Sequence, residues 1–106
     1  MKHTVALCEN RDFKRLYYRG KCTVAPHVAV YTAKNRLGVN RLGITTTKKL
    51  GNAVQRNRAR RLIKEAYRLL EYKIPLGRDI VIVARKKTVY ANMCQVMDDL
   101  EKFLCL

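Results

Sequence analysis

The chain has 106 residues, which is enough for one domain with a single modest core and too few for two. It carries 23 lysine and arginine residues against 8 acidic ones, a formal net charge of +15 that favours a polyanionic partner such as nucleic acid. No run approaches the ~20 apolar residues that span a bilayer, and the apolar residues 5–8 are too few for a signal peptide, so a membrane partner is not expected.

The cysteines argue against a zinc site and against a disulfide framework. They lie far apart in the sequence: Cys8, Cys22, Cys94 and Cys105. None forms a CxxC pair, and neither His3 nor His27 stands at metal-ligand spacing from one. Without a secretion signal, the sequence predicts reduced thiols in a cytoplasmic protein.

The first half of the chain is predicted to form a helix and a β-hairpin. Asn10 as N-cap and Gly20 as the residue after the last turn delimit a first helix. Residues 21–25 can add a short edge strand before Pro26. Residues 27–32, rich in β-branched and aromatic side chains, form a strand, and residues 41–47 form the next one after a polar loop. We expect these two strands to pair as an antiparallel hairpin.

The second half is predicted to be helix, strand, helix. The longest helix covers about residues 53–72, after Gly51 and Asn52 and before Pro75. The apolar run 80–84 indicates a central strand buried on both faces. A basic turn, 85–87, leads to a last helix over residues 93–104. The fold class is therefore α/β, a two-layer domain over residues 1–106 with a mixed sheet of three or four strands and three helices.

The long helix has one apolar and one cationic side. The apolar side comprises Ala59, Leu62, Ile63, Ala66, Leu69 and Leu70. The candidate RNA-binding residues on and beside the other side are Lys48, Lys49, Asn52, Arg56, Asn57, Arg58, Arg60, Arg61, Lys64 and Arg68. An ordinary solvated face would mix charge signs in i,i+4 pairs, but only Arg61 with Glu65 fits that pattern. The pattern therefore predicts phosphate binding, and the helix N-terminus, with Gly51 and Asn52 leaving its amides open, could add a further anion site.

A family resemblance enters with this helix. Residues 48–65, KKLGNAVQRNRARRLIKE, resemble the signature of bacterial ribonuclease P proteins, and residues 56–58 correspond to the family's RNR element. Residues 12–17, 27–31 and 79–85 agree in the same order, so the resemblance covers most of the chain.

The resemblance implies a particular fold and a particular cleft. It implies an unusual left-handed βαβ crossover, although about 98% of such connections are right-handed. It also implies that a cleft between the first helix and the sheet holds the 5′ leader of precursor tRNA, lined by Phe13, Tyr17 and Tyr31. Aromatic rings stack on unpaired bases without reading their sequence. By spacing alone, Phe13 would be a core residue, whereas Tyr31 alternates with Val28 and Val30 and faces the other side of the sheet.

No catalytic or metal-binding residues are expected in the protein itself. Phosphodiester cleavage needs an acid and a base or clustered carboxylates. The histidines lie in different elements, and Asp98, Asp99 and Glu101 on the last helix are expected to be solvated. The resemblance implies that Mg²⁺ is held by the RNA subunit and the substrate. It implies as partners the catalytic ribonuclease P RNA and precursor tRNA, with the protein assisting 5′ leader removal.

Three other functions remain as alternatives. A ribosomal or general RNA-binding protein would explain charge and fold equally well. A DNA-binding regulator fits less well, because no short helix-turn-helix spacing is present. A self-contained nuclease would cleave RNA alone and would depend on one histidine or carboxylate.

Overall fold

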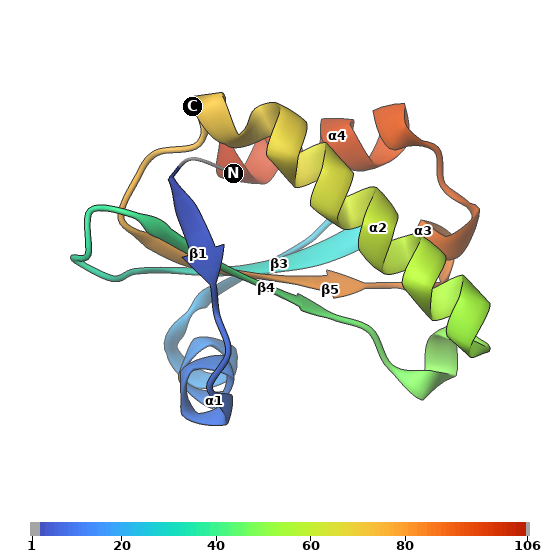
Figure 1. Ribbon diagram of the computed structural model, residues 1–106, viewed down its shortest axis with the longest axis horizontal. Coiled ribbons are helices and arrows are strands. Elements are labelled where there is room, and N and C mark those ends of the chain that lie inside the picture. The colour runs from blue at the N-terminus through green and yellow to red at the C-terminus, as the bar shows by residue number, and fades with distance from the viewer. Residues whose placement is uncertain (1–2, 106) are drawn as a thin grey trace.

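A five-stranded mixed β-sheet with helices on both faces forms the fold of the computed structural model, which describes residues 3–105 (Figure 1). In chain order the strands and helices are β1 (Thr4–Ala6), α1 (Asn10–Arg19), β2 (Lys21–Val24), β3 (Val28–Lys34), β4 (Asn40–Thr45), a 3₁₀ turn (Lys48–Leu50), α2 (Ala53–Leu70), a second 3₁₀ turn (Glu71–Lys73), β5 (Arg78–Ala84), α3 (Lys86–Tyr90) and α4 (Met93–Leu104). The α/β class is confirmed. The predicted strand and helix numbers are too low because β1 and α3, of 3 and 5 residues, are too short to show a periodic pattern.

The predicted hairpin between β3 and β4 is wrong. The strand order is β1-β4-β5-β3-β2, so β5 lies between them, parallel to β4 and antiparallel to β3. The reason is burial: Ile80, Val81 and Ile82 of β5 are completely buried, and only a central position covers both faces of so apolar a strand. The predicted central strand and the predicted edge strand, β2, are both confirmed.

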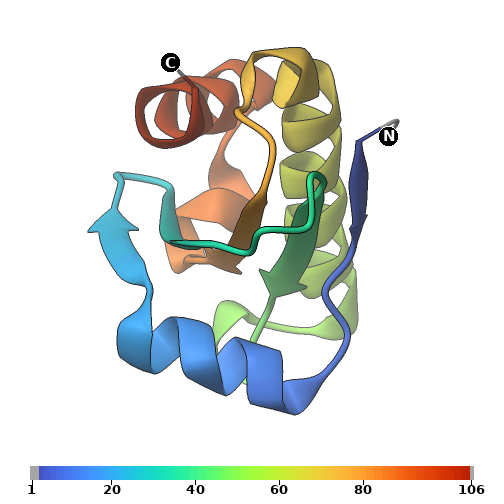
Figure 2. The same ribbon diagram turned by 90° about the vertical axis from the view of Figure 1, so that its left-hand side faces the viewer.

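The β4–α2–β5 unit is a left-handed crossover. Figure 2 looks along β4 from its first residues, with β5 to the left of β4 and α2 above the sheet. The path from β4 up through α2 and back to β5 therefore turns anticlockwise as the strands recede. This is the hand that the family resemblance implied, and it is the rare one.

The larger core lies between the sheet and helices α2, α3 and α4. Ala59, Ile63, Ala66 and Leu70 of α2 are buried in it, as predicted. The apolar pattern also predicts burial of Leu69, but this side chain is 40% exposed. The buried side chain near it is Tyr67, whose aromatic ring fills the core. Its hydroxyl group is 2.9 Å from Thr4 Oγ1 and so connects α2 with β1, and burial raises the pKa of Tyr67.

A smaller core lies on the opposite face of the sheet, under α1. Leu7, Leu16 and Val81 are buried there. Asn10 is the first helical residue of α1 and Glu9 its N-cap, one position earlier than predicted. Gly20 does end the helix, but its φ of −73° is not left-handed. Its role is close approach, since a Cβ there would lie 2.6 Å from Leu16 O.

Ion pairs around the buried carboxylate of Asp79 fix α1 to the sheet. Asp79 of β5, 1% exposed in its side chain, accepts hydrogen bonds from Arg41 Nε at 2.7 Å and Arg41 Nη2 at 2.6 Å. Arg15 Nη2 of α1 lies 3.2 Å from the same carboxylate, and Arg41 also reaches Asp12 at 3.3 Å. Burial alone would raise the pKa of Asp79, but the hydrogen bonds from Arg41 and Asn35 and the nearby positive charges outweigh it and lower the pKa.

We expect Asp79→Asn to destabilise the protein by about 3–5 kcal/mol, because it leaves the Arg41 charge without its main partner. The pKa of Asp79 is lower in the folded than in the unfolded protein. Its contribution to the free energy of unfolding is therefore complete above the unfolded pKa of about 3.9. The contribution is lost as the pH falls through the folded pKa. Urea unfolding between pH 7 and pH 2 measures both effects.

The difference in the free energy of unfolding between wild type and Asp79→Asn should therefore decrease as the pH is lowered. Asp98→Asn is the matched control, since Asp98 lies on α4, away from this cluster, and forms none of the ion pairs within residues 3–105. It should unfold like the wild type at every pH. A constant gap between wild type and Asp79→Asn down to pH 2 would contradict the ion-pair argument.

Candidate nucleic-acid interface

A capping box fixes the start of α2. Asn52 Oδ1 accepts a hydrogen bond from the Gln55 backbone N–H at 2.9 Å, and Gln55 Oε1 accepts one from the Asn52 backbone N–H at 3.0 Å. Gly51 adopts φ 134°, and a side chain there would collide with Gln55. The box therefore occupies the backbone amides of Asn52 and Gln55 within the protein. This box orients the helix, and the cationic side chains remain the candidates for phosphate binding.

The cationic side of α2 faces solvent. Asn57, Arg58, Arg60, Arg61 and Lys64 are exposed, and Arg56 is half-buried. Glu65, which has the i,i+4 spacing to pair with Arg61, pairs instead with Arg68. This pair lowers the pKa of Glu65 and raises that of Arg68. Within residues 3–105, none of the ion pairs involves the five cations from Arg56 to Lys64. Their charge is left for an external anion.

Two of these arginines are held in place by main-chain carbonyl groups. Arg58 Nε donates to Val89 O of α3 at 3.0 Å. Arg60 donates to Ile44 O at 3.4 Å and to Thr46 Oγ1 at 2.9 Å, beside β4. These bonds direct the two guanidinium groups to different neighbours, one toward α3 and the other toward the sheet edge. Each guanidinium keeps further N–H groups for phosphate contact.

The structure adds cations that the candidate set lacked. Lys48 and Lys49, which belong to the candidate set, are exposed in the 3₁₀ turn before α2, and this turn packs against α3. Lys86 and Lys87 of α3 are exposed as well. Figure 1 shows α3 beside the first turns of α2. In the sequence, Lys86 and Lys87 belong to the basic run 85–87, which by itself indicates only a turn.

The three aromatic candidates come together beneath the sheet. The rings of Tyr17 and Tyr31 meet edge to face, with centroids 4.9 Å apart and planes at 81°. Tyr17 is 42% exposed, and its hydroxyl group is 3.1 Å from Thr45 Oγ1. Phe13 is half-buried and lies over Gly43, where a Cβ would be 2.6 Å from its ring. Phe13 is therefore a core residue and a wall of the cleft at once.

The cleft beside these rings is a hollow of about 410 Å³. Its lining is aromatic, aliphatic, hydroxylic and cationic: Asn10, Phe13, Lys14, Tyr17, Ile44, Thr45, Thr46 and Arg60. A hydrogen bond with Cys22 is the main cause that raises the pKa of Tyr31. A neutral aromatic floor with cations at the rim suits a single nucleic-acid strand.

Most carboxylates of the described residues are engaged in ion pairs or hydrogen bonds. Asp99 was expected to be solvated but is only 4% exposed, because it accepts hydrogen bonds from His27 N at 2.7 Å and Nδ1 at 3.1 Å. In the part of the chain that the structure describes, no three His, Cys, Asp or Glu side chains are placed to hold a metal ion. No helix formed by residues 3–105 is long and apolar enough to cross a membrane.

Comparison with known proteins agrees with this geometry. A sequence model of the family described as Ribonuclease P matches residues 1–105. The ribonuclease P protein component of Thermoanaerobacter sp. (strain X514) is 39% identical over 100 residues, 94% of this chain and 86% of the relative. The ribonuclease P protein structure from Staphylococcus aureus superposes with a TM-score of 0.81 at 36% identity, covering 92% of this chain and 89% of that one.

The corresponding structure from Thermotoga maritima has a TM-score of 0.84 at 32% identity, over 93% of this chain and 94% of that one. Sequence and fold thus agree with those of ribonuclease P proteins along nearly the whole chain. The chain belongs to the ribonuclease P protein family.

Proposed function

We propose that this chain is the protein subunit of ribonuclease P, an endoribonuclease that removes the 5′ leader of precursor tRNA to give the mature 5′ end. The observation that carries the proposal is the pairing of two surfaces on one small fold. One is the row of cations along α2 without acidic partners, and the other is the aromatic cleft under α1. The protein component names of the relatives support the same role.

The cations of α2 bind the catalytic RNA. A folded RNA brings phosphates close together, and their repulsion opposes the compact state. Arginine side chains on a rigid helix neutralise several phosphates at once, and their planar forks contact phosphate oxygens in pairs. The expected consequence is a lower magnesium requirement of the RNA.

The aromatic cleft binds the leader. Phe13 and Tyr17 line the cleft and offer ring surfaces to unpaired bases, and Tyr31 supports Tyr17 through its edge-to-face contact. Lys14 and Arg60 of the same lining lie within reach of the phosphates. A precursor carries the leader and a mature tRNA does not. The cleft therefore favours substrate over product and leaves product release unhindered.

Catalysis is assigned to the RNA subunit, which with the substrate holds the Mg²⁺ that stabilises the charged oxygens of the cleaved phosphodiester. The side chains described here bind and orient RNA. A cytoplasmic location fits the four cysteines, all of which are free thiols.

The subunit role is tested by 5′ processing of a precursor tRNA with a bacterial ribonuclease P RNA at low magnesium. We expect cleavage only when protein and RNA are both present. RNA binding without any gain in cleavage would favour a general RNA-binding protein. Cleavage by the protein alone would reveal an active site in the protein.

Replacing Arg56, Arg58 and Arg61 by alanine should weaken binding to the catalytic RNA and flatten its salt dependence. The slope of log K against log salt should fall by about 0.7–0.9 for each phosphate that the variant no longer neutralises. Removing Lys21, Lys34 and Lys102, which line a separate hollow between the sheet and α4, is the matched control for net charge. Equal slopes for the two triple variants would contradict a specific role of α2.

Tyr17→Ala should weaken holoenzyme binding to precursor tRNA, by up to the ~1–3 kcal/mol of one stacked base, and leave mature tRNA binding unchanged. Tyr18→Ala is the matched control, since Tyr18 is the next residue of α1 and is 90% exposed. Fluorescence titration with both tRNA forms measures the two affinities. An equal loss of affinity in both variants would place the leader elsewhere.

A further inference from the structure

A hollow of about 370 Å³ lies between the sheet and the last turn of α4. Four cations from four separate elements line it: Lys21 of β2, Lys34 of β3, Arg78 of β5 and Lys102 of α4. The lining contains no carboxylate. We call this space the α4 hollow. It brings together positive charges that are far apart in the sequence.

The α4 hollow and the aromatic cleft lie on opposite faces of the sheet. Side chains alternate between the two faces of a strand, so Lys34 points to the same face as Val28 and Val30, which are buried in the larger core. Figure 1 shows α4 above the sheet and α1 below it. The sheet therefore separates the α4 hollow from the cleft under α1.

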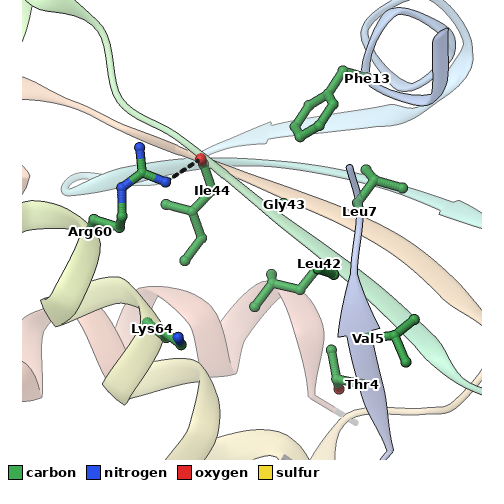
Figure 3. Close-up of a pocket in the computed structure, with 10 residues that line it drawn as sticks. Thr4, Val5, Leu7, Phe13, Leu42, Gly43, Ile44, Arg60 and Lys64 are labelled. Atoms are coloured by element: carbon green, nitrogen blue, oxygen red, sulfur yellow. Dashed lines mark hydrogen bonds between the residues drawn. The ribbon is translucent and has the colours of Figure 1, made fainter. Parts of the chain in front are cut away.

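A hollow at the open edge of β4 is a third, distinct space. β1 pairs with β4 only over residues 40–42, and the described part of the chain places no strand on that side of residues 43–45. The space there, of about 550 Å³, is lined by Phe13, Ile44 and Arg60, which also line the aromatic cleft (Figure 3). The α4 hollow shares no lining residue with either of them.

The sheet holds two cations of the α4 hollow side by side. Lys34 and Arg78 are directly opposite each other in the register of β3 with β5, a position in which like charges destabilise a sheet. The backbone near both residues is fixed by further bonds. Arg78 N donates to Asn40 Oδ1 at 3.0 Å, and Asn35 N donates to Gly77 O at 2.9 Å. The two charges thus stay close together although they repel each other.

The four cations lack acidic partners in the part of the chain that the structure describes. None of them takes part in an ion pair within residues 3–105. Of the acids on α4, Glu101 pairs with Lys73, and Asp98 and Asp99 lie outside the lining. An anion from outside the protein would therefore relieve the repulsion, and several negative charges on one ligand would relieve it best.

The rest of the lining suits a nucleotide. Phe103 of α4 lines the hollow and is 36% exposed, so its ring is open to stacking with a base. Thr23 and Thr32 add hydroxyl groups, which can hydrogen-bond to a sugar. The volume lies near the lower end of the roughly 300–1,000 Å³ of small-molecule sites. The hollow thus combines apolar, hydroxylic and cationic groups at the scale of one small ligand.

We propose that the α4 hollow binds a nucleoside diphosphate or triphosphate. The phosphate groups lie between Lys34 and Arg78, with Lys21 and Lys102 on either side, and the base lies against Phe103. This site goes beyond the function proposed above, because it uses neither the cations of α2 nor the aromatic cleft. A nucleotide bound here leaves both of those surfaces free.

Isothermal titration calorimetry of the full chain with ADP, and with inorganic pyrophosphate, tests the site. Replacing Lys34 and Arg78 by alanine should weaken ADP binding at least about 10-fold, since two charge-assisted contacts are lost. Replacing Lys48 and Lys49 by alanine is the matched control, because it also removes two positive charges but outside the hollow. We expect this control to bind ADP like the wild type.

Phe103→Leu tests the contact with the base. It keeps an apolar side chain and removes the ring, so ADP binding should weaken about 5-fold while pyrophosphate binding stays unchanged. Urea unfolding of each variant verifies that the fold is retained.

Three results would overturn the proposal. The first is an equal loss of ADP affinity in the two double variants, or no loss in either, which would mean non-specific attraction to a basic protein. The second is an unchanged ADP affinity in Phe103→Leu, which would mean that the hollow holds only a phosphate chain. The third is displacement of ADP by a single-stranded oligonucleotide that itself binds through Lys34 and Arg78, which would make the hollow part of an RNA-binding surface.

Discussion

The ion pair of the buried Asp79 with Arg41 joins α1 to the two strands that lie above the aromatic cleft. Asp79 belongs to the central strand and Arg41 to the neighbouring strand, and through Arg15 and Asp12 the same cluster binds α1. The position of α1 over the sheet sets the width of the aromatic cleft. A buried charge is tolerated only when its partners are well placed, so this cluster favours one arrangement of helix and sheet over others. In a chain of such high positive charge, two acids thus fix the frame of an RNA-binding surface.

The remaining positive charge is concentrated where acids are absent. On α2 the one nearby acid, Glu65, pairs with Arg68 and leaves the preceding cations unpaired. Self-repulsion along such a helix costs stability, which the buried face of α2 and its capping box offset. The apolar side of α2 is therefore buried in the core, and its exposed cations are neutralised only when phosphate groups bind.

The sequence predicts most where a local pattern is strong and least where distant segments meet. The long helix is placed almost to the residue, because capping residues and a regular apolar face both mark it. The predicted strand pairing is wrong at β3 and β4, because proximity in sequence favours a hairpin and nothing local shows that β5 inserts between them. Arg41 and Asp79 are 38 residues apart, and no pattern joins them. The aromatic site residues follow from a family resemblance, since the spacing of Phe13 alone indicates only a core position.

Gly43 has a consequence for the shape of the site. A single methyl group there would lie 2.6 Å from the ring of Phe13 and would push it off the sheet. Phe13 is a wall of both the aromatic cleft and the hollow at the open edge of β4, so the two spaces change together when this ring moves. The widths of the cleft and the hollow thus both depend on residue 43 having no side chain.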